Sequence, residues 1–145
     1  VAYRTSIEQI SERLEIEGVR YSKIAGADAR GFLFGAPLAL EKCVPFAMVR
    51  KKGKLPGKTV SETYQLEYGE DSIEVTDQTF GYGDRVLLVD DLLATGGTLE
   101  AMAKLVEKCG AEVAGIAVVV ELEGLGGREK LSRYPLVSLV RYQES

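Results

Sequence analysis

A chain of 145 residues is long enough for one domain with its own core, and no second domain is expected. Its net charge of −4 argues against nonspecific binding to nucleic acid or to an acidic membrane surface, and no apolar stretch approaches the roughly 20 residues that a membrane-spanning helix needs. Because the chain contains no histidine, a Ser-His or Cys-His nucleophile, an imidazole base and a histidine-bound zinc site are excluded.

The first predicted element is an amphipathic helix that Thr5 and Ser6 cap and that Gly18 ends. Strands and helices then alternate: a strand over 21–25, a helix over 32–42 and a strand over 46–50.

The middle of the chain departs from this alternation. A long polar loop is predicted over 51–62, followed by two short antiparallel strands over 63–66 and 72–75. The remaining elements are a strand over 85–90, a helix over 98–108, a strand over 113–121, a loop with a short helix over 124–131 and a strand over 136–142. This order predicts a doubly wound α/β fold, with a mostly parallel sheet flanked by helices and a small β flap. Residues 1–145 are expected to form a single domain, with 51–75 as a flexible loop and flap within it.

The most informative motif begins with the four aliphatic residues Val86–Val89, which favour a strand buried on both faces. Asp90 and Asp91 follow, at the end of the strand where open α/β sheets bind ligands. A short turn then leads into a helix, and its backbone N–H groups and hydroxyls could surround an anion; the turn consists of Ala94, Thr95, Gly96, Gly97 and Thr98. Because carboxylates repel a phosphate, we place a phosphate on the turn and sugar hydroxyls on the aspartates.

On spacing alone, this motif could equally be an ordinary strand-to-helix turn. The sequence has no nucleoside-triphosphatase loop and no Gly-x-Gly-x-x-Gly helix start, which disfavours those two kinds of nucleotide site. Basic residues also gather in one Gly/Pro-punctuated segment, which suits a small polyanion but could also be a solvated loop; they are Arg50, Lys51, Lys52, Lys54 and Lys58.

Residues 90–98 resemble the phosphoribosyl pyrophosphate signature of the type I phosphoribosyltransferases. Their amino-acid sequence is similar to that of the adenine phosphoribosyltransferases in particular. Three further blocks are similar to the same family in the same order: 26–35, 49–57 and 61–69. The similarity runs from near the start of the chain to Tyr142.

This resemblance implies a transferase that joins adenine to the ribose of phosphoribosyl pyrophosphate, giving AMP and pyrophosphate in purine salvage. It further implies Mg²⁺ as cofactor and a homodimer, with no nucleic acid or membrane as partner. Two isolated cysteines and the lack of a secretory apolar region lead us to expect a cytoplasmic protein. A transferase for another purine and a non-catalytic sensor of phosphoribosyl pyrophosphate are the alternatives.

By resemblance, Ala29 and Arg30 belong to the loop that binds pyrophosphate, although Arg30 alone could be a surface ion pair. Lys54 and Lys58 would bring positive charge to the same group. Residues 61–69 resemble a flap that closes over the site and excludes water, which would otherwise capture the cationic ribose.

The resemblance also implies roles at the base. Glu67, which with Arg30 is expected to be catalytic, would assist transfer of a proton of the base, and Tyr68 would pack beside it. Leu122 would contact one face of the purine. Asp90 and Asp91 would bind the ribose hydroxyls and stabilise the cationic ring. Glu67 and Tyr68 could also be two residues of an exposed strand.

Members of the family carry a further segment before the position where these residues begin, a hood that adds backbone contacts to the base. Adenine specificity is therefore inferred from the matching blocks. We expect the 145 residues alone to use bases with weak selectivity.

Overall fold

The computed structural model describes residues 2–66 and 68–143. In chain order the elements are α1 (Ala2–Ile16), β1 (Lys23–Ala27), α2 (Arg30–Lys42), β2 (Phe46–Lys51), β3 (Thr59–Leu66), β4 (Gly69–Thr76), β5 (Arg85–Leu93), α3 (Gly97–Lys108), β6 (Glu112–Glu123), α4 (Gly127–Lys130) and β7 (Leu136–Gln143).

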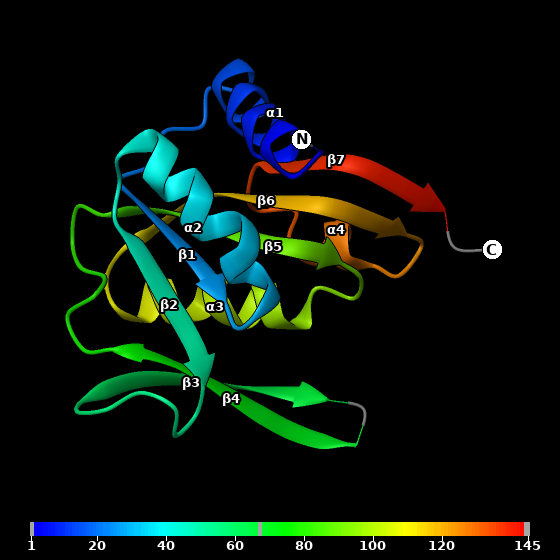
Figure 1. Ribbon diagram of the computed structural model, residues 1–145. Helices are drawn as coiled ribbons and strands as arrows, with labels where there is room; N and C mark the ends of the chain where they lie inside the picture. Colours follow the sequence, from blue (N-terminus) through cyan, green and yellow to red (C-terminus); the bar gives the residue numbers. More distant parts are fainter. Residues whose placement is uncertain (1, 67, 144–145) are drawn as a thin grey trace.

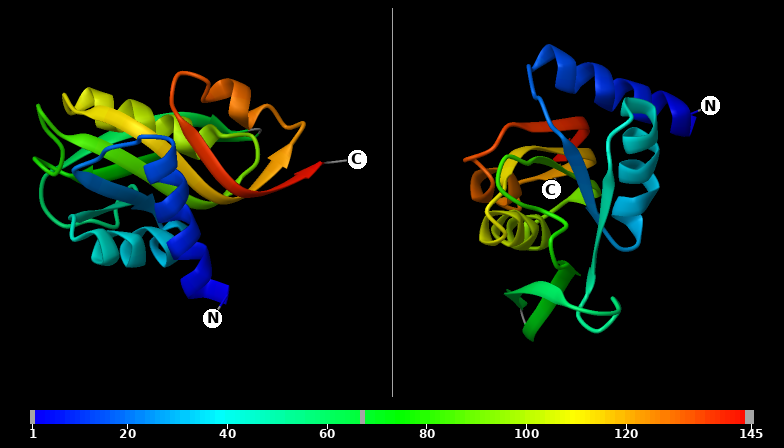
Figure 2. Two further views of the ribbon diagram at one scale, coloured as in Figure 1. Left: turned by 90° about the horizontal axis from the view of Figure 1, so that it is seen from above. Right: turned by 90° about the vertical axis from the view of Figure 1, so that its left-hand side faces the viewer.

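The strands form one sheet of seven in the order β3-β4-β2-β1-β5-β6-β7 (Figure 1). β2, β1, β5, β6 and β7 run parallel, whereas β4 pairs antiparallel with both β2 and β3. Helices α1 and α2 cover one face of the sheet, and α3 and α4 cover the other (Figure 2). The predicted doubly wound α/β fold is confirmed.

The core explains why the aliphatic run of β5 is continuous. Val86, Leu87, Leu88 and Val89 are all fully buried. Val86 and Leu88 pack into the cluster on the α3 face, whereas Leu87 and Val89 pack into the cluster under α1 and α2. Because alternate side chains meet helices on opposite faces, each position is apolar, and each such side chain stabilises the fold by about 1.5–3 kcal/mol.

The flap is the β3–β4 hairpin, whose two strands pair with each other over a longer stretch than β4 pairs with β2. β3 and β4 pair from Thr59–Thr76 to Leu66–Gly69, whereas β4 pairs with β2 only at Arg50–Glu74 and Lys51–Ile73. The far end of the hairpin lies on the same side as the carboxyl ends of β5 and β6 (Figure 1).

Several boundaries differ from the sequence-based expectation: β1 covers 23–27 instead of 21–25, α2 begins at Arg30 instead of 32, and β4 begins at Gly69 instead of 72. Three further differences have a physical reason in the structure. Helix α1 begins at Ala2, so Thr5 and Ser6 lie within it, and the Ser6 hydroxyl donates to the carbonyl oxygen of Ala2 at 3.0 Å instead of capping the helix. β3 begins at Thr59, so the polar loop covers only 52–58, because pairing with β4 extends the strand.

The third difference concerns the carboxylates. β5 continues to Leu93, so Asp90 and Asp91 lie within the strand and not after it. The physical reason is its neighbour, because β6 runs alongside to the end, pairing Leu92 with Val120 and Leu93 with Glu121.

Within the described residues, none of the helices has the length and apolar character needed to cross a membrane.

Candidate functional site

The candidate site lies where the sheet changes direction. The chain winds from β1 to β2 on one side and from β5 through β6 to β7 on the other, so β1 and β5 are neighbours whose following segments diverge. Such a topological switch point opens a crevice at the carboxyl ends of the strands. A cleft of about 410 Å³ lies there. It is lined by Arg30, Tyr64, Gln65, Leu66, Asp90, Leu92, Leu93, Ala94, Thr95, Gly96, Gly97, Thr98, Leu99 and Lys130.

A second hollow of similar volume, about 380 Å³, lies between α1 and α2. None of the predicted site residues lines it, so we assign the chemistry to the cleft at the switch point.

The turn of residues 94–98, hereafter the phosphate turn, connects β5 to α3. Gly96 has a φ of +85°, a left-handed conformation that favours glycine. No described side chain caps the start of α3, so its first backbone N–H groups remain available to a ligand. At Gly97 an added Cβ would meet no atom within 4 Å, so this position borders open space. The phosphate turn therefore has the shape and the free donors of an anion site.

The carboxylate pair lies beside this turn. The backbone N–H of Asp91 donates to Oδ1 of Asp90 at 2.8 Å. Oδ1 of Asp91 is buried and has no hydrogen-bond partner among the described residues. Burial and the neighbouring Asp91 together raise the pKa of Asp90 to about 7. A buried acceptor without a donor fits a hydroxyl group of a ligand.

Arg30, the first residue of α2, reaches the same place. Its side chain is 70% exposed, and its Nε lies 3.4 Å from Oδ2 of Asp91. Gly31 allows this approach, because a Cβ there would lie 3.1 Å from the carbonyl oxygen of Val89 in β5. Arg30 is thus both a surface ion pair and a residue of the cleft. Ala29 precedes it at the start of α2 and is exposed.

Neither Ala29 nor Asp91 is among the residues that line the cleft, and four further predicted residues also do not line it as the structure describes it. Lys54 and Lys58 are exposed in the segment after β2, Tyr68 is 94% exposed and Leu122 is half-buried in β6. Glu67 lies outside the described residues. The roles of all these residues stay predictions.

Sequence reasoning did not single out two groups of lining residues. Tyr64, Gln65 and Leu66 of β3 line the cleft because the hairpin packs over α3; the resemblance placed them in a flap over the site, segment 61–69, but assigned them no individual role. Lys130 reaches the cleft from α4, and only the folded chain reveals that position.

The raised pKa of Asp90 predicts a pH effect on stability. A carboxyl group whose pKa is near 7 when folded and 3.8 when unfolded binds its proton more tightly in the folded state. Its contribution to stability is therefore full below about pH 4 and is lost as pH rises toward 7, where Asp91 faces it as a like charge and Arg30 only partly compensates. Asp90→Asn should raise the free energy of unfolding at pH 8 by at least about 1 kcal/mol and much less at pH 4.

Urea unfolding at both pH values measures this effect. Asp77→Asn, which removes a carboxylate in the connection from β4 to β5 that does not line the cleft, serves as the control. Equal changes for Asp90→Asn at the two pH values would contradict the assignment.

Comparisons with known proteins agree with one another. A family model described as "Phosphoribosyl transferase domain" matches residues 3–141. The adenine phosphoribosyltransferase of Desulfitobacterium hafniense is 52% identical over 144 residues, which covers 97% of this chain and 80% of that protein.

Solved structures are similar as well. The crystal structure of adenine phosphoribosyltransferase from Thermoanaerobacter pseudethanolicus has a TM-score of 0.93 and 50% identity, covering 97% of this chain and 81% of that one. The enzyme from Saccharomyces cerevisiae, complexed with an imino-altritol bisphosphate and adenine, has a TM-score of 0.88 and 40% identity, covering 94% and 78%.

Proposed function

Because the chain belongs to the adenine phosphoribosyltransferase family, we propose that it transfers the phosphoribosyl group of phosphoribosyl pyrophosphate to adenine, forming AMP and pyrophosphate in purine salvage. The observation that carries this proposal is the cleft itself, in which Asp90 and an uncapped helix start line the same space, with Asp91 next to Asp90 in the strand. The yeast relative, crystallised with a sugar-like bisphosphate and adenine, supports the same substrate class.

Each part of the cleft then has a chemical role. The phosphate turn holds the 5′-phosphate through backbone N–H groups at the positive end of α3. Asp90 and Asp91 accept hydrogen bonds from the ribose hydroxyls, and the unpartnered Oδ1 of Asp91 is one acceptor for them. As pyrophosphate departs, positive charge develops on the ribose ring, and ionised carboxylates nearby stabilise it.

Arg30 is proposed to bind the departing pyrophosphate. The Arg30 side chain is exposed and lines the cleft. Its guanidinium can therefore give up the ion pair with Asp91 and bind a phosphate oxygen instead. Ala29, Lys54 and Lys58 are assigned to the same group by family resemblance.

Mg²⁺ is the proposed cofactor. The described residues form no group of three or more His, Cys, Asp or Glu side chains that could hold a metal by themselves. The oxygen donors present in the cleft fit an ion held mainly by substrate oxygens and water, with Asp90 and Asp91 nearby. When bound, Mg²⁺ would neutralise charge on the leaving pyrophosphate.

At the base, Glu67, Tyr68 and Leu122 keep the roles that the resemblance implies. Glu67→Gln should slow the chemical step by about 100-fold, because a general acid or base typically contributes at least that much, and should leave affinity for phosphoribosyl pyrophosphate unchanged. Single-turnover kinetics measures the step. Glu70→Gln, a nearby exposed carboxylate that accepts from Gln65, is the matched control. An unaltered single-turnover rate for Glu67→Gln would show that the proton moves by another route.

The decisive experiment measures pyrophosphate release from phosphoribosyl pyrophosphate and Mg²⁺ with and without adenine. Adenine-dependent release, with AMP as product, supports the proposal. Release that depends on hypoxanthine, guanine or xanthine instead would identify a transferase for another purine. Binding of phosphoribosyl pyrophosphate without release in the presence of any base would indicate a sensor.

A homodimer in the cytoplasm completes the proposal. Leu33 and Leu40, seven positions apart on α2, are 57% and 81% exposed, and Met48 of β2 is 47% exposed on the sheet face that α2 covers. Such apolar exposure favours a protein contact. Cys43 and Cys109 are free thiols, as is usual where thiols are kept reduced. Sedimentation of the wild type and of Leu40→Glu tests the dimer.

A further inference from the structure

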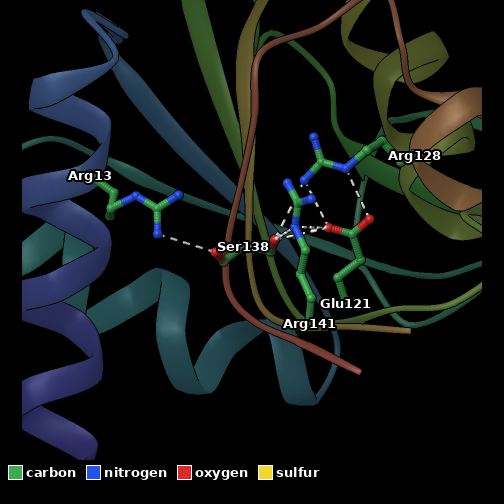
Figure 3. Close-up of polar contacts among 5 residues, drawn as sticks. All are labelled: Arg13, Glu121, Arg128, Ser138 and Arg141. Carbon is green, nitrogen blue, oxygen red and sulfur yellow. Dashed lines mark hydrogen bonds and ion pairs between the residues drawn. The ribbon is translucent and has the colours of Figure 1, made fainter. Parts of the chain in front are cut away.

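A buried charge cluster lies beside the cleft and takes no part in the chemistry assigned so far. Glu121 of β6 is only 3% exposed. Arg128 of α4 donates two hydrogen bonds to it, from Nε to Oε2 at 2.9 Å and from Nη2 to Oε1 at 2.8 Å (Figure 3). The Ser138 hydroxyl donates to Oε1 at 2.9 Å, and Arg141 Nε lies 3.4 Å from the same oxygen. Glu121 is thus a fully partnered carboxylate.

This cluster determines where α4 lies. The helix has only four residues, too few to be stable alone. Two side chains hold it against the sheet. Arg128 makes its two hydrogen bonds to Glu121, and Leu131, which is fully buried, packs into the core on the α3 face. A two-point guanidinium contact with a buried carboxylate fixes orientation as well as distance. Arg128 also lowers the pKa of Glu121, so the carboxylate keeps its charge at neutral pH.

The other side of α4 touches the phosphate turn. A Cβ at Gly127 would lie 2.4 Å from the carbonyl oxygen of Ala94 and 2.7 Å from Cδ1 of Leu93. A Cβ at Gly96 would lie 3.2 Å from Cα of Gly127. The backbone of α4 therefore supports the turn from behind, so closely that neither glycine leaves room for a side chain.

Lys130, one helical turn farther on, lines the cleft together with Thr95, Gly96 and Gly97. Its side chain is exposed, so its ammonium group is accessible to a ligand.

We propose that the Glu121–Arg128 pair is a positioning device for the phosphate site. By fixing α4, it holds Gly127 against the phosphate turn and places Lys130 where its ammonium group binds a phosphate of the sugar substrate. This inference rests on the proposed function, and it assigns Lys130 a direct contact and Arg128 an indirect one.

The test uses steady-state kinetics and calorimetry with phosphoribosyl pyrophosphate and Mg²⁺. Lys130→Gln should raise the KM for phosphoribosyl pyrophosphate by about 3- to 10-fold, as expected for the loss of one charged hydrogen bond, and leave the KM for adenine unchanged. Arg128→Gln should raise the same KM by about 10- to 100-fold, with a smaller change in kcat, because the turn and Lys130 are both displaced. Arg133→Gln is the matched control and should behave like the wild type. It also removes one positive charge, but the Arg133 side chain is 74% exposed and pairs with Glu107.

The double variant separates positioning from general loss of stability. If Arg128 acts by placing Lys130, then adding Lys130→Gln to Arg128→Gln should raise the KM by less than Lys130→Gln does alone. Effects that simply multiply would overturn the inference. Should Arg128→Gln fail to fold, Arg128→Lys, which keeps the charge but lacks the fork, replaces it in the same comparison.

The wild type separates this inference from the function on which it rests. A wild-type chain that neither binds phosphoribosyl pyrophosphate nor releases pyrophosphate with adenine would overturn the proposed function. A wild type that does both, while Lys130→Gln and the Arg128 variant bind phosphoribosyl pyrophosphate as tightly, would overturn the positioning inference alone.

Discussion

Replacing both Asp90 and Asp91 by asparagine should lower kcat by about 100- to 1,000-fold, the range seen when a preorganised electrostatic group is removed from an active site. The substitution keeps the size of each side chain but removes the charges that face the cationic ribose. The substitution also removes the free-energy cost of ionising Asp90, whose pKa is raised in the folded protein. The variant should therefore be at least as stable at pH 8 as the wild type. The signature of this variant is a stable protein with a slow chemical step.

Single-turnover measurements at saturating phosphoribosyl pyrophosphate and adenine report that step directly. Asp77→Asn removes one carboxylate at the opposite end of the sheet and should keep normal turnover. Near-normal turnover in the double variant would refute the role of the carboxylate pair.

Gly97→Val should abolish detectable binding of phosphoribosyl pyrophosphate while leaving the fold intact. The structure separates these two effects, because a side chain at Gly97 would enter open space at the start of α3, where a phosphate must approach the backbone N–H groups. The free energy of unfolding should change by less than about 1 kcal/mol. Calorimetry with Mg²⁺ present measures the binding.

Two other glycines serve as controls for this result. Gly81→Val also enters open space, but in the connection from β4 to β5, so affinity should remain normal. Gly96→Val should destabilise the protein, because Gly96 has a positive φ and packs against Gly127. Unchanged affinity in Gly97→Val would show that the phosphate binds elsewhere.

Local sequence patterns predicted the parts of the molecule that local forces determine. The run Val86–Val89 identified the central strand because each of its side chains is buried, and the glycine-containing turn after it identified the start of α3. The position of Asp90 and Asp91 was less accurate, because the end of β5 depends on how far β6 runs beside it. Strand ends are determined by partners that a linear pattern does not contain.

The supporting parts of the site could not be predicted for a similar reason. Glu121 and Arg128 are ordinary charged residues in the sequence, and only the packed fold shows that one of them is buried and the other partly so. Likewise, Lys130 reaches the cleft only because α4 packs beside it. Tertiary packing determines which of several similar charges matter.

The β3–β4 hairpin is attached to β2 by two residue pairs, whereas its own two strands pair along their whole length, so a rotation where it joins β2 would move its far end. Near its root, Val60, Ile73 and Val75 are anchored in the core, whereas Leu66 at the far end is 52% exposed and borders the cleft. At about 3.4 Å per residue, the arm from Val60 to Leu66 is roughly 20 Å long. A rotation of about 10° at the root would move the end of such an arm by about 3.5 Å. A swing of that size would keep the ladder of the hairpin intact, but it would change the two pairs with β2 and the packing of β3 on α3, where Lys108 donates to the carbonyl oxygen of Ser61 at 2.7 Å. Because Tyr64, Gln65 and Leu66 line the cleft, such a rotation would change the width of the cleft at this end of β3.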